Sequence, residues 1–412
     1  MVIAALTIRL IVMAFTYTAF LDPALDHKAF GYETGRVARS IATGQGFSSP
    51  YSEPTGPTAL IPPAYTYLLA GIFKGFGVYT PASALIILAL NNLFSALTCV
   101  PVFLIARKVF GPIVAIWAGW IWALFPYAIT LPNVAIWETT LTTLLLTLLV
   151  LATLYLDHST SMVAWIGYGL LWGFAALSSP TVISTLPFLG AWIWLRHWRR
   201  GGNCTGPAFV AALLFFATVG PWVWRCSRVY GHFVPFRSGF GLDFKVGNSD
   251  DTSTPSNWKV LPADNPDELR ELKLVGEPTY MAEMQREANQ FMAHQTGRFV
   301  RQTLRRILFT WTGIWDFPPR WTLADSGWPN VLTYTFFSLL ALVGTAAAFR
   351  DGHEGVIPLL IPLLCIPLAY YITHADIRFR HPADPEVVVF AAYGVISLMR
   401  NKSKKIILPD NS

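Results

Sequence analysis

Residues 82–106 have the sequence ASALIILALNNLFSALTCVPVFLIA, in which no side chain is charged. A helix of about 20 apolar residues crosses the hydrocarbon core of a bilayer, so this stretch predicts a transmembrane helix. Residues 139–156 and 356–373 are uncharged in the same way. Across the 412 residues of the chain 53% are hydrophobic and only 13% are charged, whereas a soluble domain usually carries about 25% charged residues. The sequence therefore predicts an all-α polytopic membrane protein.

Apolar segments of this kind predict about ten transmembrane helices. They begin near residues 2, 82, 112, 139, 162, 181, 207, 328, 356 and 387. The first segment lacks a basic leading region and a small-residue cleavage site, so we expect a retained helix and not a signal peptide. Arg9 falls inside this segment, and we expect its long side chain to snorkel towards the cytoplasmic headgroups.

Basic residues fall in the short connections on one side of the predicted helices. They are Arg107, Lys108, the RHWRR sequence at 196–200, Arg350, Lys402, Lys404 and Lys405. The positive-inside rule places this side, and both chain termini, in the cytoplasm. The predicted organisation is a transmembrane core at 1–227 with a first outer loop at 22–80, an extracytoplasmic region at 228–327, and C-terminal helices with a short cytoplasmic tail at 328–412. This arrangement accounts for the net charge of +6, and we expect no nucleic-acid partner.

The first outer loop is expected to hold two short helices that lie along the membrane surface. Residues 33–43 place apolar side chains four positions apart, and Gly44 and Gly46 would end that helix. Pro63 can begin a second helix that runs to Phe76. This second helix is too short to span a bilayer comfortably but suits the interface.

The position of the charges excludes several function classes. Ion-coupled transporters carry ionisable groups inside their spans, and the predicted spans here are almost free of them. The chain has no GxxxxGK[ST] phosphate loop, and its four cysteines are scattered without metal-ligand spacing. The charged residues lie instead beside the outer membrane surface, where they suit an enzyme that acts on a lipid with a polar head.

Glu33 and Glu138 are the carboxylates predicted to lie at this surface at similar depth. Glu33 could act as a general base that takes the proton of an acceptor hydroxyl. A helical salt bridge with Arg36, three residues on, is the structural alternative. Glu138 opens a predicted helix, where the helix dipole favours an acid in any case. Together the two carboxylates could bind a divalent metal, or one of them could orient the acceptor.

The sequence HADIRFRHPADP at 374–385 contains Arg378 and Arg380 in alternation. In an extended strand the two arginines would point the same way, and the guanidinium fork matches phosphate oxygens. Contact with lipid headgroups is the alternative. The histidines and aspartates of this stretch match no standard metal pattern. We expect the basic residues Arg301, Arg305 and Arg306 to touch anionic headgroups.

The chain resembles the GT-C membrane glycosyltransferases, in the branch of the protein O-mannosyltransferases and the lipid A aminoarabinose transferases. The resemblance rests on YETGRVARSIATGQGFSSP in the first outer loop, GPTALIPPAYTYLLAGIFKGFG after it, ARKVFG, WETTLTTLLL, and RFRHPADPEVVVFAAYG before the last span. It implies a polyprenyl-phosphate sugar donor used on the outer face of the cytoplasmic membrane, with a lipid, glycan or protein as acceptor. It also implies Glu33 as catalytic base, a role for Glu138, and phosphate contacts from Arg378 and Arg380.

Two departures from the family pattern are visible. A lone Glu33 stands where many relatives have an Asp-Glu pair, with Asp22 and Asp26 as nearby alternatives. The Glu-Lys-Pro of the aminoarabinose branch is replaced by residues 61–63, Ile-Pro-Pro. The donor phosphate would then fall to Lys74 and to the arginines, which are Arg36, Arg39, Arg378 and Arg380.

The expected reaction is an inverting single displacement. An outer-face polysaccharide polymerase or ligase, which would depend on arginines in large loops, is the second hypothesis. A non-enzymatic lipid or solute transporter is the third.

Overall fold

The computed structural model describes residues 1–17, 30, 32–250, 252, 257–315 and 328–407, with side chains up to residue 400. Within these ranges the chain is helical and forms no strand, only an isolated bridge between Ser48 and Pro57. This confirms the predicted all-α class. Asp22 and Asp26 lie outside the described residues.

Six helical stretches are long and apolar enough to cross a membrane. They are α4–α5 (Pro81–Leu97, Cys99–Phe110), α6–α7 (Pro112–Leu124, Pro126–Val134), α8 (Thr139–Leu156), α11 (Thr205–Tyr230), α16 (Trp328–Arg350) and α19–α20 (Ile377–Arg380, Asp384–Ile407). Shorter apolar helices are α1 (Val2–Thr16), α9 (Met162–Ser178) and α17–α18 (Val356–Cys365, Leu368–Ile372). The short helix α10 (Leu186–Arg199) follows α9 in the chain. Every predicted segment coincides with one of these helices, so the protein is a multi-pass membrane protein. The count of ten spans stays a prediction.

Glycines bring neighbouring helices of this bundle into close contact. A Cβ on Gly344 of α16 would collide with the carbonyl oxygen of Phe390 in α20, and one on Gly394 would lie 2.6 Å from the carbonyl oxygen of Leu340. Helices in a lipid environment associate through such close packing of small residues, because the lipid leaves little hydrophobic driving force between them.

Arg9 lies inside the bundle and does not snorkel, so that prediction is wrong. Its side chain is fully buried and donates hydrogen bonds to Ser95 Oγ at 2.9 Å and to the carbonyl oxygens of Ala123 and Ala128 at 3.0 and 2.9 Å. Ala123 belongs to the last turn of α6, where carbonyl groups have no partner within the helix. Arg9 supplies those partners and thereby joins α1 to α4, α6 and α7.

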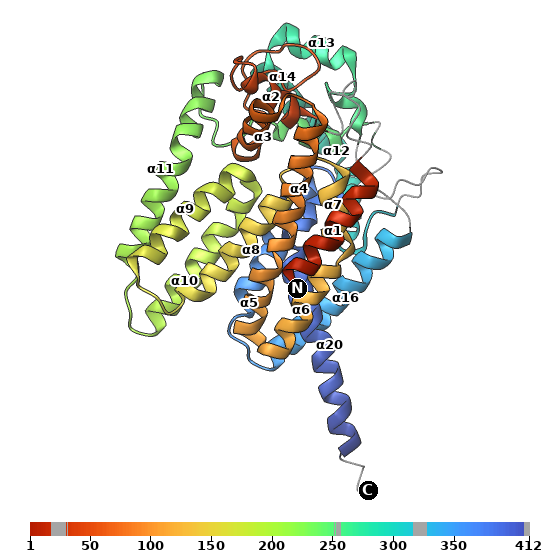
Figure 1. The fold of residues 1–412 in the computed structure, drawn as a ribbon. Helices are drawn as coiled ribbons and strands as arrows, with labels where there is room; N and C mark the ends of the chain where they lie inside the picture. The colour runs from red at the N-terminus through yellow and green to blue at the C-terminus, as the bar shows by residue number, and fades with distance from the viewer. Residues whose placement is uncertain (18–29, 31, 251, 253–256, 316–327, 408–412) are drawn as a thin grey trace.

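One end of the bundle carries the remaining helices, which we call the cap (Figure 1). The cap consists of α2 (Glu33–Ala42), α3 (Pro63–Phe76), α12 (Phe240–Gly247), α13 (Pro266–Val275), α14 (Glu277–His294) and α15 (Thr296–Thr312). The two short helices predicted in the first loop are thus present as α2 and α3. Their position at a membrane surface stays a prediction.

Two buried or half-buried side chains hold residues 47–60 of the first loop on the cap. Arg225 donates hydrogen bonds to the carbonyl oxygens of Phe47, at 2.6 Å, and Thr58. The carboxylate of Glu277, at the first position of α14, accepts a hydrogen bond from the backbone N–H of Ala59 at 3.3 Å. The first loop is therefore fixed by residues that follow it by more than 150 positions.

The opposite end of the bundle holds the basic connections, and the C-terminus projects from it (Figure 1). Asp157 forms ion pairs with Arg196 and Arg200, both at 3.0 Å, and Arg196 also pairs with Glu354. The basic connections and the cap thus occupy opposite ends, which is the arrangement that the predicted topology requires. The assignment of this end to the cytoplasm stays a prediction.

Candidate active site

Glu33 stands at the first position of α2, just after a tight backbone turn. The preceding residue, Tyr32, has φ +49° and ψ −114°, a conformation that non-glycine residues rarely adopt and that stores strain. Gly35 permits the turn, because a Cβ there would collide with the carbonyl oxygen of Phe30. The direction of the Glu33 side chain is thus set by a constrained piece of backbone.

The Glu33 carboxyl is half-buried and charged neighbours from three segments surround it. Burial raises its pKa above the usual value, and Asp243 on α12 acts in the same direction. Its own backbone N–H and the positive charges of Arg36 and Arg378 oppose the shift without reversing it. Arg36, one helical turn away and buried, therefore does not turn Glu33 into an ordinary surface carboxylate.

Arg378 is brought to this site by α19. The carboxylate of Asp376 caps that helix by accepting the backbone N–H of Arg378 at 2.9 Å. The guanidinium lies over the ring of Trp137, 4.1 Å from its centre. Its Nε has no hydrogen-bond partner among the residues that the structure describes, although a carboxylate oxygen of Asp376 lies 3.8 Å away.

Arg380 does not share this surface, and the predicted strand is wrong. Residues 377–380 form a helical turn, in which positions two apart point to different sides. The Arg380 side chain is 1% exposed and pairs with Asp384 at 2.8 Å. It also donates a hydrogen bond to Ser338 Oγ at 2.9 Å and lies 4.3 Å from the Tyr334 ring. Arg380 therefore joins α20 to α16 inside the bundle.

Arg237 and Asp243 complete the site, and sequence reasoning missed both. They form an ion pair at 2.6 Å. Burial lowers the pKa of Arg237, but the negative charges of Asp243, Glu138 and Glu33 outweigh it and leave that pKa above the usual value. Arg237 is thus the common neighbour of both predicted carboxylates. The sequence signal for this pair is its isolation, because Arg237 and Asp243 are the only charged residues in FVPFRSGFGLDF at 233–244.

The remaining predicted phosphate ligands occupy different surroundings. Arg39 is half-buried on α2 and its guanidinium lies 5.9 Å from the centre of the Tyr79 ring. Lys74 is exposed in the last turn of α3. The charges of Arg36 and Arg378 thus act on Glu33, and the charges of Glu33 and Glu138 both act on Arg237.

The predicted metal site would be formed by Glu33 and Glu138. In the parts of the chain that the structure describes, no three His, Cys, Asp or Glu side chains are grouped so that they could hold an ion. The charges of Glu33 and Glu138 both act on the Arg237 guanidinium, and a metal held by these two carboxylates stays a prediction.

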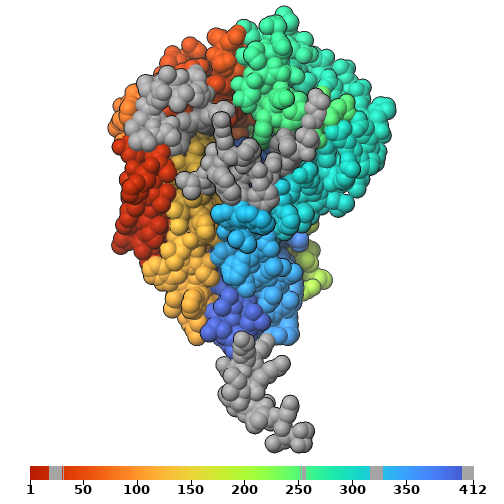
Figure 2. Space-filling view, turned by 90° about the vertical axis from the view of Figure 1, so that its right-hand side faces the viewer, coloured from red at the N-terminus to blue at the C-terminus, as the bar shows by residue number. Residues whose placement is uncertain are grey.

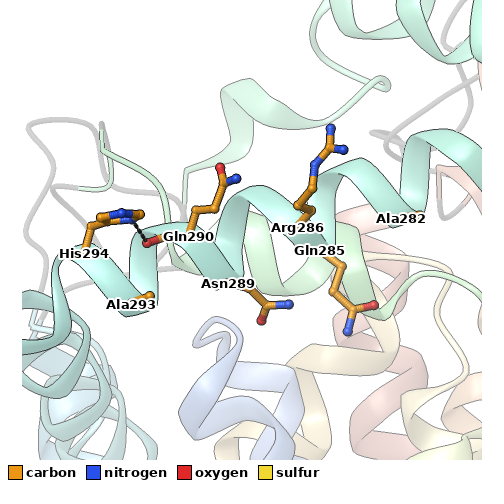
Figure 3. A pocket seen from close by; sticks show the side chains of 7 residues that line it. All are labelled: Ala282, Gln285, Arg286, Asn289, Gln290, Ala293 and His294. Carbon is orange, nitrogen blue, oxygen red and sulfur yellow. Dashed lines mark hydrogen bonds between the residues drawn. The ribbon is translucent and has the colours of Figure 1, made fainter.

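A separate hollow of about 420 Å³ lies along one face of α14 (Figure 3). The side chains that line it include Gln285, Arg286, Asn289, Gln290 and His294, whose Nδ1 lies 2.8 Å from the Gln290 carbonyl oxygen. All the lining residues belong to this one helix. We therefore assign the hollow no part in the chemistry around Glu33.

Comparisons with known proteins place the fold. Residues 61–224 match the model of the dolichyl-phosphate-mannose-protein mannosyltransferase family. This match runs from α3 to α11 and includes Lys74 and Glu138 but not Glu33 or Arg378. No curated protein matches the chain in sequence.

Solved membrane glycosyltransferases have a similar structure. The oligosaccharyltransferase of Archaeoglobus fulgidus in its apo form has a TM-score of 0.56 at 15% identity, over 100% of this chain and 52% of its own. The same enzyme tethered to an acceptor peptide with the NVT sequon has a TM-score of 0.54 at 14% identity, over 99% and 51%. ArnT from Cupriavidus metallidurans bound to undecaprenyl phosphate is 11% identical over 97% of this chain and 79% of its own, with a TM-score of 0.41.

The chain spans about half the length of the oligosaccharyltransferase that it matches. It has the GT-C fold of membrane glycosyltransferases, as the sequence predicted.

Proposed function

We propose that the protein is a membrane glycosyltransferase, which moves a sugar from a polyprenyl-phosphate donor to an acceptor hydroxyl on the outer face of the cytoplasmic membrane. The observation that carries the proposal is the placement of the Glu33 carboxyl beside Arg36 and Arg378 at one end of a GT-C bundle. The matching family, whose description names a dolichyl-phosphate sugar, supports a lipid-phosphate donor.

In this proposal Glu33 is the general base. The acceptor oxygen attacks the anomeric carbon of the sugar while Glu33 takes the hydroxyl proton. The bond from that carbon to the phosphate oxygen breaks, and its electron pair leaves with the lipid phosphate, which inverts the anomeric centre. The raised pKa of Glu33 favours this role, because a base is most effective when its pKa approaches the working pH.

Arg378 and Arg237 are the proposed partners of the phosphate. Negative charge accumulates on the departing phosphate, and cations that are already in place stabilise it without reorganisation. Stacking on Trp137 holds the plane of the Arg378 guanidinium, and the Nε atoms of Arg378 and Arg237 have no hydrogen-bond partner in the described part of the chain. Guanidinium N–H groups of this kind suit phosphate oxygens.

The test compares Glu33→Gln with Glu53→Gln in cells that lack the native protein. Glu53 is an exposed glutamate of the same loop that pairs with Lys273, so its substitution controls for loss of a loop charge. Mass spectrometry of membrane lipids and surface glycans is expected to show loss of one glycan and accumulation of its lipid-linked sugar only with Glu33→Gln. Unchanged glycans in that variant, at normal protein levels in the membrane, would overturn the proposal.

A further inference from the structure

Helix α15 (Thr296–Thr312) exposes a continuous apolar stripe. Val300, Leu304 and Leu308 are 47%, 61% and 47% exposed, and at about 100° per residue they cover an arc of roughly 80°. Arg301 and Arg305 are also exposed and follow directly beside this arc. An apolar stripe flanked by arginines is typical of helices that lie in the membrane interface.

The C-terminal end of α15 packs beside the middle of the membrane-spanning helix α16. The carbonyl oxygens of Trp311 and Thr312 accept hydrogen bonds from Ser338 Oγ at 2.6 Å and Thr335 Oγ1 at 3.2 Å. Ser338 lies ten residues into α16, which is about 15 Å along the helix axis. The stripe therefore does not rise into water.

The lipid-facing surface of α16 continues the stripe. Leu332, Phe336 and Leu339 of that helix are 63%, 58% and 59% exposed. In the space-filling view the teal cap region that contains α15 adjoins the light-blue α16 (Figure 2). The apolar side chains of the two helices thus form one surface of the kind that lipid tails cover.

Arg306 anchors the opposite face of α15. We predicted that its side chain touches lipid headgroups, and the buried position shows that this prediction is wrong. Arg306 is 1% exposed and points about 200° away from Leu304 around the helix. Its guanidinium donates hydrogen bonds to the Gly247 carbonyl, to Asn248 Oδ1 at 3.3 Å, and to the Ile372 carbonyl at 3.3 Å.

Both segments held by Arg306 lead to the candidate site. Gly247 ends α12, the helix that carries Asp243. Ile372 ends α18 and stands six residues before Arg378. His374, between Ile372 and Arg378, is buried and its Nδ1 lies 3.4 Å from the Asp243 carbonyl oxygen. A shift of α15 would therefore be transmitted to Arg378 and Asp243 together.

We propose that α15 binds an anionic phospholipid surface and that this binding positions Arg378 and Asp243 through Arg306. The apolar stripe enters the acyl region, while Arg301 and Arg305 bind lipid phosphates. This inference concerns the cap and its lipid surroundings, and it stands or falls independently of the reaction proposed above.

Amide hydrogen exchange on the full chain in nanodiscs tests the proposal without any sugar substrate. Nanodiscs of phosphatidylcholine alone are compared with nanodiscs that also contain phosphatidylglycerol. We expect slower exchange with phosphatidylglycerol in residues 296–312, 240–248 and 371–378, by about five-fold for each arginine that binds lipid. Equal exchange in the two lipids would overturn the proposal.

Matched variants separate lipid binding from coupling. Arg301→Gln with Arg305→Gln should abolish the lipid response, whereas Arg270→Gln with Arg286→Gln, on exposed arginines of α13 and α14, should keep it. Arg306→Gln should keep the response of residues 296–312 and lose that of residues 371–378. The proposal is wrong if both double variants respond alike to phosphatidylglycerol. It is also wrong if the exchange of residues 371–378 still depends on the lipid in Arg306→Gln. The surface variants leave the buried contacts intact, so they remain informative even if Arg306→Gln does not fold.

Discussion

The guanidinium of Arg378 lies over the indole ring of Trp137, 4.1 Å from its centre. This stacking joins the segment before α8 to the segment before α20, which lie more than 200 residues apart in the chain. The residue after Trp137 is Glu138, the N-cap of α8. The contact therefore connects two of the segments that hold predicted site residues.

Replacement of Trp137 by leucine should reduce sugar transfer, because the Arg378 plane would lose its support. A cation–π contact contributes about 0.5–2 kcal/mol, which corresponds to a rate loss of roughly 2–30-fold. Trp137→Phe keeps an aromatic face and should retain most of the activity. Initial rates with membrane vesicles and the identified donor provide the measurement; equal rates for leucine and phenylalanine would show that the stacking does not matter.

Stability measurements distinguish two roles of Glu33: a carboxylate whose charged form is destabilised by burial, and a carboxylate that forms a stabilising salt bridge with Arg36. The pKa of Glu33 is raised in the folded state, so the folded protein binds this proton more tightly than the unfolded chain does. The linked stability is present below the unfolded pKa and is lost as the pH rises through the folded pKa. Glu33→Gln should consequently unfold at a higher temperature than wild type at pH 7, and the difference should shrink in acid. A structural ion pair predicts the reverse, a variant less stable at neutral pH.

The same raised pKa predicts the acidic limb of the activity profile. Glu33 must be deprotonated to accept the acceptor proton, so the rate should rise with pH through the folded pKa, above the usual value for glutamate. Initial rates measured across the pH range provide the test. A profile that stays flat from pH 7 down to the unperturbed glutamate range would argue against Glu33 as the base.

Arg380→Ala should destabilise the bundle, since it removes the guanidinium that pairs with the buried carboxylate of Asp384 and leaves only His381 beside it. Loss of one member of a buried pair costs about 3–5 kcal/mol, and replacement of both members by apolar residues costs much less. Thermal unfolding in detergent should show a large drop for Arg380→Ala and a partial recovery for Arg380→Leu with Asp384→Leu. A stable Arg380→Ala variant that lacks activity would instead return Arg380 to the phosphate site.

Chelation of divalent ions should leave transfer unchanged. The charges of Glu33 and Glu138 both act on the Arg237 guanidinium, and the proposed mechanism takes the positive charge of the site from arginine side chains. Rates measured before and after EDTA treatment, with manganese or magnesium restored, give the answer. Loss of activity on chelation and recovery with one ion would mean that the two carboxylates come together around a metal in the working enzyme.

The sequence was sufficient for the helices because their signal is local. An uncharged run such as residues 139–156 needs no knowledge of its neighbours to be recognised as a span, and Pro63 began α3 as expected. Such local patterns and the family resemblance were enough to predict the all-α fold class and to choose the first loop, with Glu33, as a candidate site.

Long-range contacts account for the errors. Arg9 and Arg380 looked like membrane-surface arginines because their partners, such as the Ala123 carbonyl and Asp384, are recruited only when the bundle is packed. Arg237 was missed because its place beside Glu33 depends on the loop that carries it, which has no periodic pattern. Arginines of this chain thus lie inside the bundle (Arg9), in the candidate site (Arg237) and on an exposed helix face (Arg301). Composition alone does not distinguish these three environments.

The contact between Ala59 and Glu277 also has a consequence for biosynthesis. The first loop emerges early during translation, but the carboxylate that fixes it belongs to a residue made more than 200 positions later. At roughly 5–20 residues per second the ribosome needs on the order of tens of seconds to reach Glu277. During that interval the loop that carries Glu33 has no docking partner from α14, so we expect it to stay accessible to proteases and to incorrect pairing until Glu277 has been made.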